Sequence, residues 1–129
     1  MKSTTAFFLD HFEHPRNSGT LPNPDASVEL ENPACGDILK LSARVREGRI
    51  TEICFLARGC VPAIACGSAL TELVGGATLT EAAALPREDL IQKLGFLPEA
   101  STHASQLAID ALSALLRQLQ AIQRVRSGQ

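Results

Sequence analysis

The stretch LKLSARVREGRITEICFLA, residues 39–57, decides the fold of this chain. Apolar and polar residues alternate over residues 39–46, which is the period of a strand with one buried face. Glu47-Gly48 predicts a tight turn, and residues 49–57, rich in Ile and Phe, return as an antiparallel partner. Residues 27–31 alternate in the same way and add a short strand upstream. The first half of the chain is therefore expected to form a small antiparallel meander.

Helical patterns flank these strands. Residues 4–14 carry three Phe at helical spacing and end at Pro15, and Pro62 suits the first turn of a helix that runs to Val74. Two short helices are predicted next, one over TLTEAAAL with Thr78 or Thr80 as its cap and one over PREDLIQKLG, which Gly95 closes. A last, long helix is predicted from the apolar stripe between Ala104 and Ile122, with Ser101 or Thr102 as its cap. The order predicts an α+β fold, in which a three-stranded antiparallel sheet packs against several helices and a long C-terminal helix.

Composition narrows the functional classes. At 129 residues the chain is expected to form one domain over residues 1–129, with a core that folds without disulfides. Its 45% hydrophobic and 20% charged residues are typical of a soluble globular protein, and a net charge of -2 argues against nucleic acid or an anionic membrane as a partner. No apolar run has the length of a membrane span, and acidic and His residues occur too early for a signal peptide. We expect a cytoplasmic protein with reduced cysteines.

Candidate metal-binding side chains stand at the joints between the predicted elements. Cys35 lies in the turn ENPACGDIL, and Asp37 follows two residues later, on the same face of an extended chain. Cys60 precedes the Pro62 helix, where the unpaired N–H groups of a helix start favour thiolate. His103 lies in the first turn of the last helix, and neutral imidazole is the form that binds metal. Together these side chains would form a four-ligand site of mixed hardness.

Each of these residues also has a purely structural interpretation. A cytosolic Cys is often a small buried hydrophobe, the spacing of these cysteines does not match a CxxC zinc site, and a His near a helix start is often a capping or surface residue. For three further sets the sequence favours a structural interpretation: Cys54 as packing, His11 and His14 as non-ligands, and Arg117, Arg124 and Arg126 as a solvated helix face, with charges that suit its C-terminal end, rather than a binding patch. The residues alone leave the metal role of the other side chains open.

Several motifs together resemble one family. DHFEHPRNSG, NPACGDILKL, RGCVPAIA followed by TELVGGATL, and LGFLPEASTHAS are similar, in this order, to the NifU-like (IscU-type) iron–sulfur cluster scaffold proteins. The resemblance spans nearly the whole chain and implies the fold of that family. The family builds its cluster on the Cys and Asp of a CGD motif, the Cys of a GC motif, and a His-Cys pair on the last helix. By position, the resemblance implies Cys35, Asp37, Cys60 and His103 as the metal ligands.

The chain departs from the family pattern at two places. Where the family has His-Cys-Ser this chain has His103-Ala104-Ser105, so the third assembly cysteine is replaced by a residue without a ligand atom. The chaperone-recognition segment of the family is reduced to LPEAS, residues 97–101, which puts handover through an Hsp70-type chaperone in doubt. Cys66 has two interpretations, either a replacement ligand one turn from Cys60 or a core residue in the apolar stripe of its helix.

The resemblance implies a non-enzymatic scaffold that assembles and releases an iron–sulfur cluster, [2Fe-2S] in the simplest case. Sulfur would come from a cysteine desulfurase as a persulfide on Cys60 or Cys35, and recipient apo-proteins would take the cluster from a monomer or weak homodimer. Asp oxygen and His nitrogen hold such a cluster less firmly than thiolates, which suits transfer. Two alternatives remain. One is a zinc- or iron-binding regulatory module of the same fold, and the other is a thiol-dependent enzyme with Cys60 as nucleophile and His103 as base.

Overall fold

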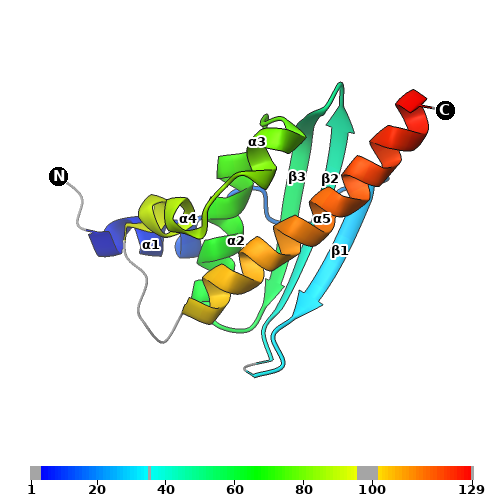
Figure 1. Cartoon of the computed structure of the whole chain (residues 1–129). Coiled ribbons are helices and arrows are strands. Elements are labelled where there is room, and N and C mark those ends of the chain that lie inside the picture. The colour runs from blue at the N-terminus through cyan, green and yellow to red at the C-terminus, as the bar shows by residue number, and fades with distance from the viewer. Residues whose placement is uncertain (1–3, 35, 96–101, 129) are drawn as a thin grey trace.

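The computed structural model of the chain describes residues 4–34, 36–95 and 102–128. These residues form three strands and five helices (Figure 1). The strands are β1 (Ala26–Glu31), β2 (Ile38–Arg46) and β3 (Arg49–Arg58). The helices are α1 (Thr4–Glu13), α2 (Val61–Val74), α3 (Leu79–Ala83), α4 (Arg87–Leu94) and α5 (Thr102–Gly128). The predicted α+β fold, with its meander and long C-terminal helix, is confirmed.

The sheet is antiparallel throughout, in the order β1-β2-β3. Leu41 lies opposite Val28 on one side and Phe55 on the other, so that three apolar side chains share one face. This face forms the core, where Leu41 is fully buried and Phe55 is 2% exposed. A register shift between Arg44 and Val45 marks a bulge near the β2–β3 hairpin, and it changes which residues of the two strands lie opposite each other.

Two helices cover the apolar face of the sheet. The long α5 crosses in front of the strands, and α2 lies beside it against β3 (Figure 1). Their approach is close, because a Cβ added at Gly67 of α2 would lie 2.5 Å from the ring of Phe55. Helices α1 and α4 pack on the other side of α2, so most α2 side chains are buried all round. The sequence pattern did not show that α2 would be covered on two sides.

The segment between α1 and β1 crosses the opposite face of the sheet. It pairs with the edge of β3 through Gly19 N–H to Phe55 O at 2.8 Å and Phe55 N–H to Asn17 O at 2.9 Å. It then passes over β2, where Leu21 N–H donates to Ser42 Oγ at 3.3 Å. This confirms the connecting loop predicted from its Pro, Gly and Asn content.

The predicted helix ends agree with the structure where residues are described. Thr78 forms a complete capping box with Glu81 at the start of α3, and Gly95 ends α4 in the left-handed conformation. Helix α2 begins one residue before Pro62, with Cys60 as its N-cap. Ser101 lies outside the described residues, and Thr102 is the first residue of α5. None of the described helices combines the length and the apolar character that crossing a bilayer requires.

Candidate functional site

Asp37 and Cys60, which are 23 residues apart in the sequence, meet at one end of the sheet. Asp37 lies immediately before β2, and Cys60 lies in the joint between β3 and α2. The Cys60 thiol lies 3.0 Å from Asp37 Oδ2, and the Cys60 backbone N–H donates to Asp37 Oδ1 at 3.1 Å. The carboxyl is only 4% exposed, whereas Cys60 is exposed. The structure thus holds a carboxylate in a fixed orientation beside an accessible thiol.

Gly59 allows this contact. Its φ is +128°, in the left-handed half of backbone space that favours glycine, and this turns the chain from β3 into α2. A Cβ at this position would lie 2.8 Å from Asp37 Cγ and 3.1 Å from Asp37 Cα. Any side chain here would therefore displace the carboxyl from Cys60. This lack of space explains why glycine precedes Cys60 in the GC motif on which part of the sequence resemblance rests.

Cys60 also caps helix α2 in an unusual way. Ser, Thr, Asp or Asn at this position would accept a backbone N–H bond, but Cys60 makes no side-chain cap bond. Pro62 lies in the first turn and has no N–H to satisfy, and Ala63 N–H donates to Cys60 O at 3.1 Å. The thiol contacts Asp37 instead of capping the helix, and it lies where the positive end of the helix dipole favours an anion.

Cys35, the first predicted ligand, lies outside the described residues, but its flanking segment is described. Asn32 N–H donates to Asp37 O at 2.8 Å, and Gly36 N–H donates to Asn32 O at 2.7 Å. The Asn32 side chain also accepts the Ala34 N–H at 3.0 Å. These bonds close the β1–β2 loop at its base. The loop is therefore anchored directly to the residue that contacts Cys60.

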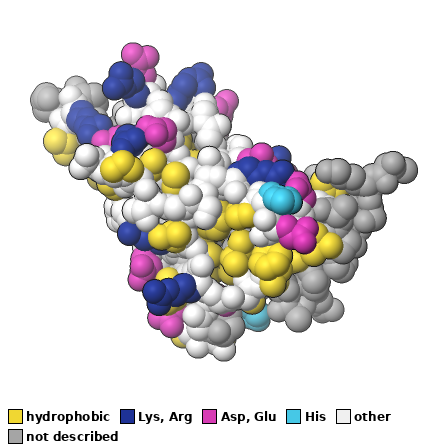
Figure 2. All heavy atoms as spheres, turned by 180° about the vertical axis from the view of Figure 1, so that it is seen from behind, with side chains coloured by type: hydrophobic (Ala, Val, Ile, Leu, Met, Phe, Trp, Pro, Cys, Tyr) yellow, Lys and Arg dark blue, Asp and Glu magenta, His cyan; other side chains and the backbone are white. Residues whose placement is uncertain are grey.

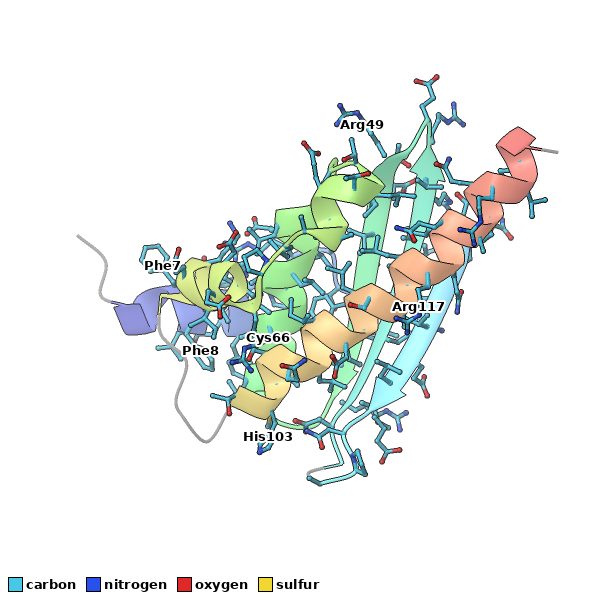
Figure 3. All side chains as sticks on the ribbon, in the orientation of Figure 1. Phe7, Phe8, Arg49, Cys66, His103 and Arg117 are labelled. Atoms are coloured by element: carbon cyan, nitrogen blue, oxygen red, sulfur yellow. The ribbon has the colours of Figure 1, made fainter. Side chains whose placement is uncertain are left out.

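His103 is the second residue of α5, as predicted, and its ring is exposed. It lies at the start of the helix (Figure 3) and lines a cavity of about 240 Å³ together with Asn32 and Pro33 of the β1–β2 loop. His103 thus lies against the β1–β2 loop, whose last residue is Asp37. Within the part of the chain that the structure describes, no three His, Cys, Asp or Glu side chains lie close enough to hold one metal ion. The structure therefore brings Asp37 and Cys60 together, and it places His103 against the β1–β2 loop as a separate group.

Cys66 lies in the core, with no exposed surface. Burial is the main cause that raises the pKa of its thiol to about 12, and the nearby Cys60 adds to the shift. A ligand must be a thiolate, so this thiol is poorly suited to bind metal in this conformation. Ala104, at the place of the missing family cysteine, is also buried, at 3% exposure. These observations favour the core interpretation of Cys66.

The structure also places Cys54 and His11, which the sequence did not favour as ligands. Cys54 is half-buried, and burial raises its pKa above the ordinary value, which agrees with a packing role. His11 is not a surface residue, because its Nδ1 lies 2.8 Å from Ser68 Oγ in the buried contact between α1 and α2. Burial lowers the pKa of His11, and the neighbouring Arg16 lowers it further. Its position among three Phe was the only signal in the sequence that could have indicated burial. The LPEAS segment lies outside the described residues.

The comparison with known families shows which family the chain belongs to. The family described as NifU-like N terminal domain matches residues 4–125. The chain belongs to this family. The NifU-like assignment agrees with the resemblance carried by the CGD, GC and HAS motifs, and it covers every candidate ligand, including Cys35.

Known relatives of this NifU-like chain are iron–sulfur cluster assembly proteins by name. The chain is 42% identical to the assembly scaffold protein IscU of Escherichia coli K12 over 112 residues, which cover 84% of this chain and 87% of that protein. It is 41% identical to IscU 1 of Archaeoglobus fulgidus over 104 residues, which cover 81% of this chain and 68% of that protein. These relatives are named as scaffolds and not as enzymes, in agreement with the non-enzymatic class predicted from the sequence.

Solved structures confirm the NifU-like fold. The N-terminal part of a NifU-like protein from Brucella abortus has a TM-score of 0.71 at 23% identity, and the match covers 89% of this chain and 92% of that one. A putative assembly scaffold for the SUF system from Fervidobacterium islandicum AW-1 has a TM-score of 0.70 at 19% identity, covering 85% and 93%. At these identities the likeness shows the fold alone.

Proposed function

We propose that this chain is a single-domain scaffold on which an iron–sulfur cluster of the [2Fe-2S] type is assembled and then released. The observation that carries the proposal is the contact between Asp37 and Cys60 at one end of the sheet. His103 lies against the β1–β2 loop at the same end. Membership of the NifU-like family and the scaffold names of its relatives support the proposal. The cluster is the cargo of the chain rather than a resident cofactor.

The proposed ligands are Cys35, Asp37, Cys60 and His103. Each iron of a [2Fe-2S] cluster takes two protein ligands, so the Asp37–Cys60 pair would serve one iron and Cys35 with His103 the other. An oxygen and a nitrogen ligand bind the soft cluster less firmly than thiolates. Cys60 and His103 are exposed, so a recipient protein would reach the cargo directly. Mixed, exposed ligation therefore suits transfer better than storage.

Sulfur would arrive as a persulfide from a cysteine desulfurase. The Cys60 sulfur would bond to the outer sulfur of the donor persulfide, the donor sulfur–sulfur bond would break, and the proton lost by Cys60 would be taken up by the departing donor thiolate. The exchange is balanced without an oxidant, because one persulfide and one thiol give one thiol and one persulfide. Cys60 is the first acceptor we propose because it is exposed at the positive end of α2. Cys35 is the second.

Cys66 has no ligand role in this proposal. The resulting site contains two thiols, which makes the chain a scaffold that holds its cargo weakly. We further propose a reducing compartment such as the cytoplasm, since thiol ligands must stay reduced there. Recipient apo-proteins would take the cluster from a monomer or a weak homodimer. The altered LPEAS segment argues against handover through a dedicated Hsp70-type chaperone.

The test is anaerobic reconstitution with iron, cysteine and a desulfurase. Iron and acid-labile sulfide per chain are measured for the unaltered protein, for Cys60→Ala, and for Cys66→Ala as the matched control in the helix that Cys60 precedes. We expect loading in the unaltered protein and in Cys66→Ala, and a loss of most loading in Cys60→Ala. Folding of each variant is checked by circular dichroism.

Each outcome decides between the candidates. Loss of the cluster in Cys66→Ala with the fold intact would show that Cys66 is a ligand and refute the two-thiol site. No sulfide in any variant, with one tightly held zinc per chain, would favour the zinc-binding module instead. Sulfide loading that survives removal of both Cys35 and Cys60 would refute the sulfur-acceptor role.

A further inference from the structure

Asn32 holds the loop between β1 and β2 through three hydrogen bonds. Its backbone N–H donates to Asp37 O at 2.8 Å, and its backbone carbonyl accepts the Gly36 N–H at 2.7 Å. Its side-chain Oδ1 accepts the Ala34 N–H at 3.0 Å. Ala34 and Gly36 are the two sequence neighbours of Cys35. One residue thus bonds the loop on both sides of the first proposed thiol ligand.

The side chain of Asn32 supplies a bond that depends on its residue type. Pro33 follows it and favours an extended backbone at residue 32, and Asn accepts the N–H two residues further on more readily than most residues do. The bond from Asn32 to Asp37 continues the β1–β2 register one step beyond Glu31 and Ile38. A substitution other than proline retains that backbone bond, so it removes the contribution of the side chain alone.

Asn32 also lies next to the groups that are proposed to bind the cluster. It is half-buried, whereas the other described residues of the loop before Asp37 are exposed. It lines the cavity of about 240 Å³ that His103 also lines. Its backbone partner Asp37 places a carboxylate oxygen 3.0 Å from the Cys60 sulfur. Movement of the loop at Asn32 would therefore change the position of Asp37 relative to Cys60 and the space beside His103.

We propose that Asn32 is a positioning residue of the cluster site, because its Oδ1 holds the β1–β2 loop in one conformation before iron arrives. This inference rests on the proposed scaffold function and names a residue outside the four ligands. A loop that is already ordered loses less conformational entropy when its ligands bind metal. The bond to Ala34 therefore raises the metal affinity of the site without adding a ligand atom.

The size of the effect follows from a single hydrogen bond. The net contribution of one such bond corresponds to about two- to tenfold in an equilibrium constant. In the unaltered protein this contribution is present before the metal binds, whereas a protein without the Asn32 oxygen must order the loop while it binds. We therefore expect the dissociation constant for metal to rise by about two- to tenfold when the oxygen is removed.

The test uses the full, reduced chain under anaerobic conditions and Co²⁺ alone as the probe. Co²⁺ binds to thiolate, imidazole and carboxylate ligands, and its absorption reports which of them it takes. The dissociation constant is measured for the unaltered protein, for Asn32→Leu, which has a similar size and no acceptor, and for Asn32→Asp, which keeps an acceptor oxygen. Urea unfolding of each metal-free protein measures its stability in parallel.

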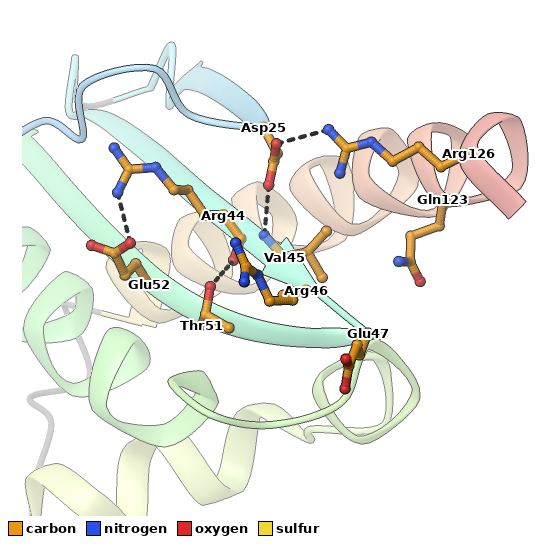
Figure 4. Close-up of a pocket in the computed structure, with 9 residues that line it drawn as sticks. All are labelled: Asp25, Arg44, Val45, Arg46, Glu47, Thr51, Glu52, Gln123 and Arg126. Atoms are coloured by element: carbon orange, nitrogen blue, oxygen red, sulfur yellow. Dashed lines mark hydrogen bonds and ion pairs between the residues drawn. The ribbon is translucent and has the colours of Figure 1, made fainter.

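Asp25→Leu is the matched control at the other end of the sheet. Asp25 Oδ2 accepts the Val45 N–H at 2.8 Å, so a side-chain oxygen again holds a backbone N–H next to a strand (Figure 4). Charged side chains of both signs lie over this end, at the upper left of the view from behind (Figure 2). The ten residues of β3, a span of about 30 Å, separate it from Cys60. The substitution also removes the ion pair with Arg126, so its loss of stability should be at least as large as that of Asn32→Leu.

We expect Co²⁺ to bind about two- to tenfold more weakly to Asn32→Leu, and no more than about twofold more weakly to Asn32→Asp and Asp25→Leu. The absorption spectrum at saturating Co²⁺ should be the same in Asn32→Leu and the unaltered protein, because Asn32 is not a ligand. A changed saturated spectrum, equal weakening by Asp25→Leu, or failure of Asn32→Asp to restore affinity would each overturn the inference. Binding of Co²⁺ that is equally tight in every variant would overturn the positioning role alone, whereas an unaltered protein that binds no Co²⁺ would overturn the proposed site as well.

Discussion

Replacing Gly59 by Ala tests whether the Asp37–Cys60 contact stabilises the protein. The new Cβ would lie 2.8 Å from Asp37 Cγ, so the carboxyl must move, and the backbone at φ +128° would be strained as well. The substitution does not remove a ligand atom. It strains the backbone at residue 59 and takes the space that Asp37 occupies beside the thiol.

The magnitude follows from two contributions. The strained backbone conformation costs about 1–2 kcal/mol for a residue with a Cβ. Displacing Asp37 breaks its bonds with the Cys60 N–H and thiol, and losing hydrogen bonds to a buried charged group adds about 2–3 kcal/mol. We therefore expect Gly59→Ala to lower the free energy of unfolding by about 3–5 kcal/mol, a large part of the about 5–15 kcal/mol that holds a typical domain together.

The chain offers a matched control at Gly19. Its φ of +127° is nearly the same as that of Gly59, but a Cβ at Gly19 would meet nothing within 4 Å. Gly19→Ala therefore measures the backbone contribution alone, about 1–2 kcal/mol. Urea unfolding followed by circular dichroism gives the free energy for both variants, and a thermal scan should show the larger fall in melting temperature for Gly59→Ala.

Equal destabilisation by the two substitutions would refute the reasoning, because it would mean that the Asp37 contact contributes nothing beyond backbone strain. A Gly59→Ala protein that unfolds from an altered fold would be recognised by a changed urea dependence of unfolding. A difference of about 2–3 kcal/mol between Gly59→Ala and Gly19→Ala would confirm that the Asp37 carboxyl is held in place by Cys60.

Three further predictions concern single residues. Cys66 should resist iodoacetamide at pH 8 in the folded protein and react only on unfolding, because burial raises its pKa to about 12, and mass spectrometry of the alkylated peptides checks this. The pKa of His11 is lowered by burial, so below the ordinary value of 6.5 the unfolded chain binds more protons than the folded one, and stability should fall as pH drops from 6.5. His11→Gln should flatten this slope of stability between pH 7 and pH 5, as measured by urea unfolding. An unchanged slope would contradict the burial of His11. The pKa of Asp25 is lowered by hydrogen bonds from the Val45 N–H and Arg126, so its contribution to folding stability is present above the ordinary value of 3.8 and is lost as pH falls through the lower folded value. The stability difference between the unaltered protein and Asp25→Asn should therefore shrink from pH 6 to pH 3. A constant difference would argue against these bonds.

Local patterns were sufficient to predict most of the fold. Strand alternation over residues 39–57 specifies which side chains share a face, and a tight turn between the two runs leaves antiparallel pairing as the simplest result. The capping box at Thr78 and the left-handed Gly95 were also predictable, because caps depend on residues within one turn. These features rest on contacts between residues close in sequence.

The position of Cys66 was decided only by the tertiary structure. Its three- and four-residue spacing shows that one face of α2 is buried, but not that α1 and α4 bury the other side as well. The same holds for His11, whose partner Ser68 is 57 residues away. Burial is a sum over neighbours from distant segments, and a periodic pattern on one helix does not contain that sum.

The candidate site divides in the same way. The sequence shows that Cys35 and Asp37 are two residues apart and predicts that Cys60 and His103 stand at helix starts, so the types of the candidate ligands could be predicted before their arrangement. Only the fold places the Asp37 carboxyl 3.0 Å from the Cys60 sulfur, through the pairing of β2 with β3 and the left-handed turn at Gly59. Likewise, only the strand register sets Arg46 against Arg49, because a bulge shifts the pairing beyond Arg44. Residue types follow from the sequence, whereas distances between them depend on how separate segments pack.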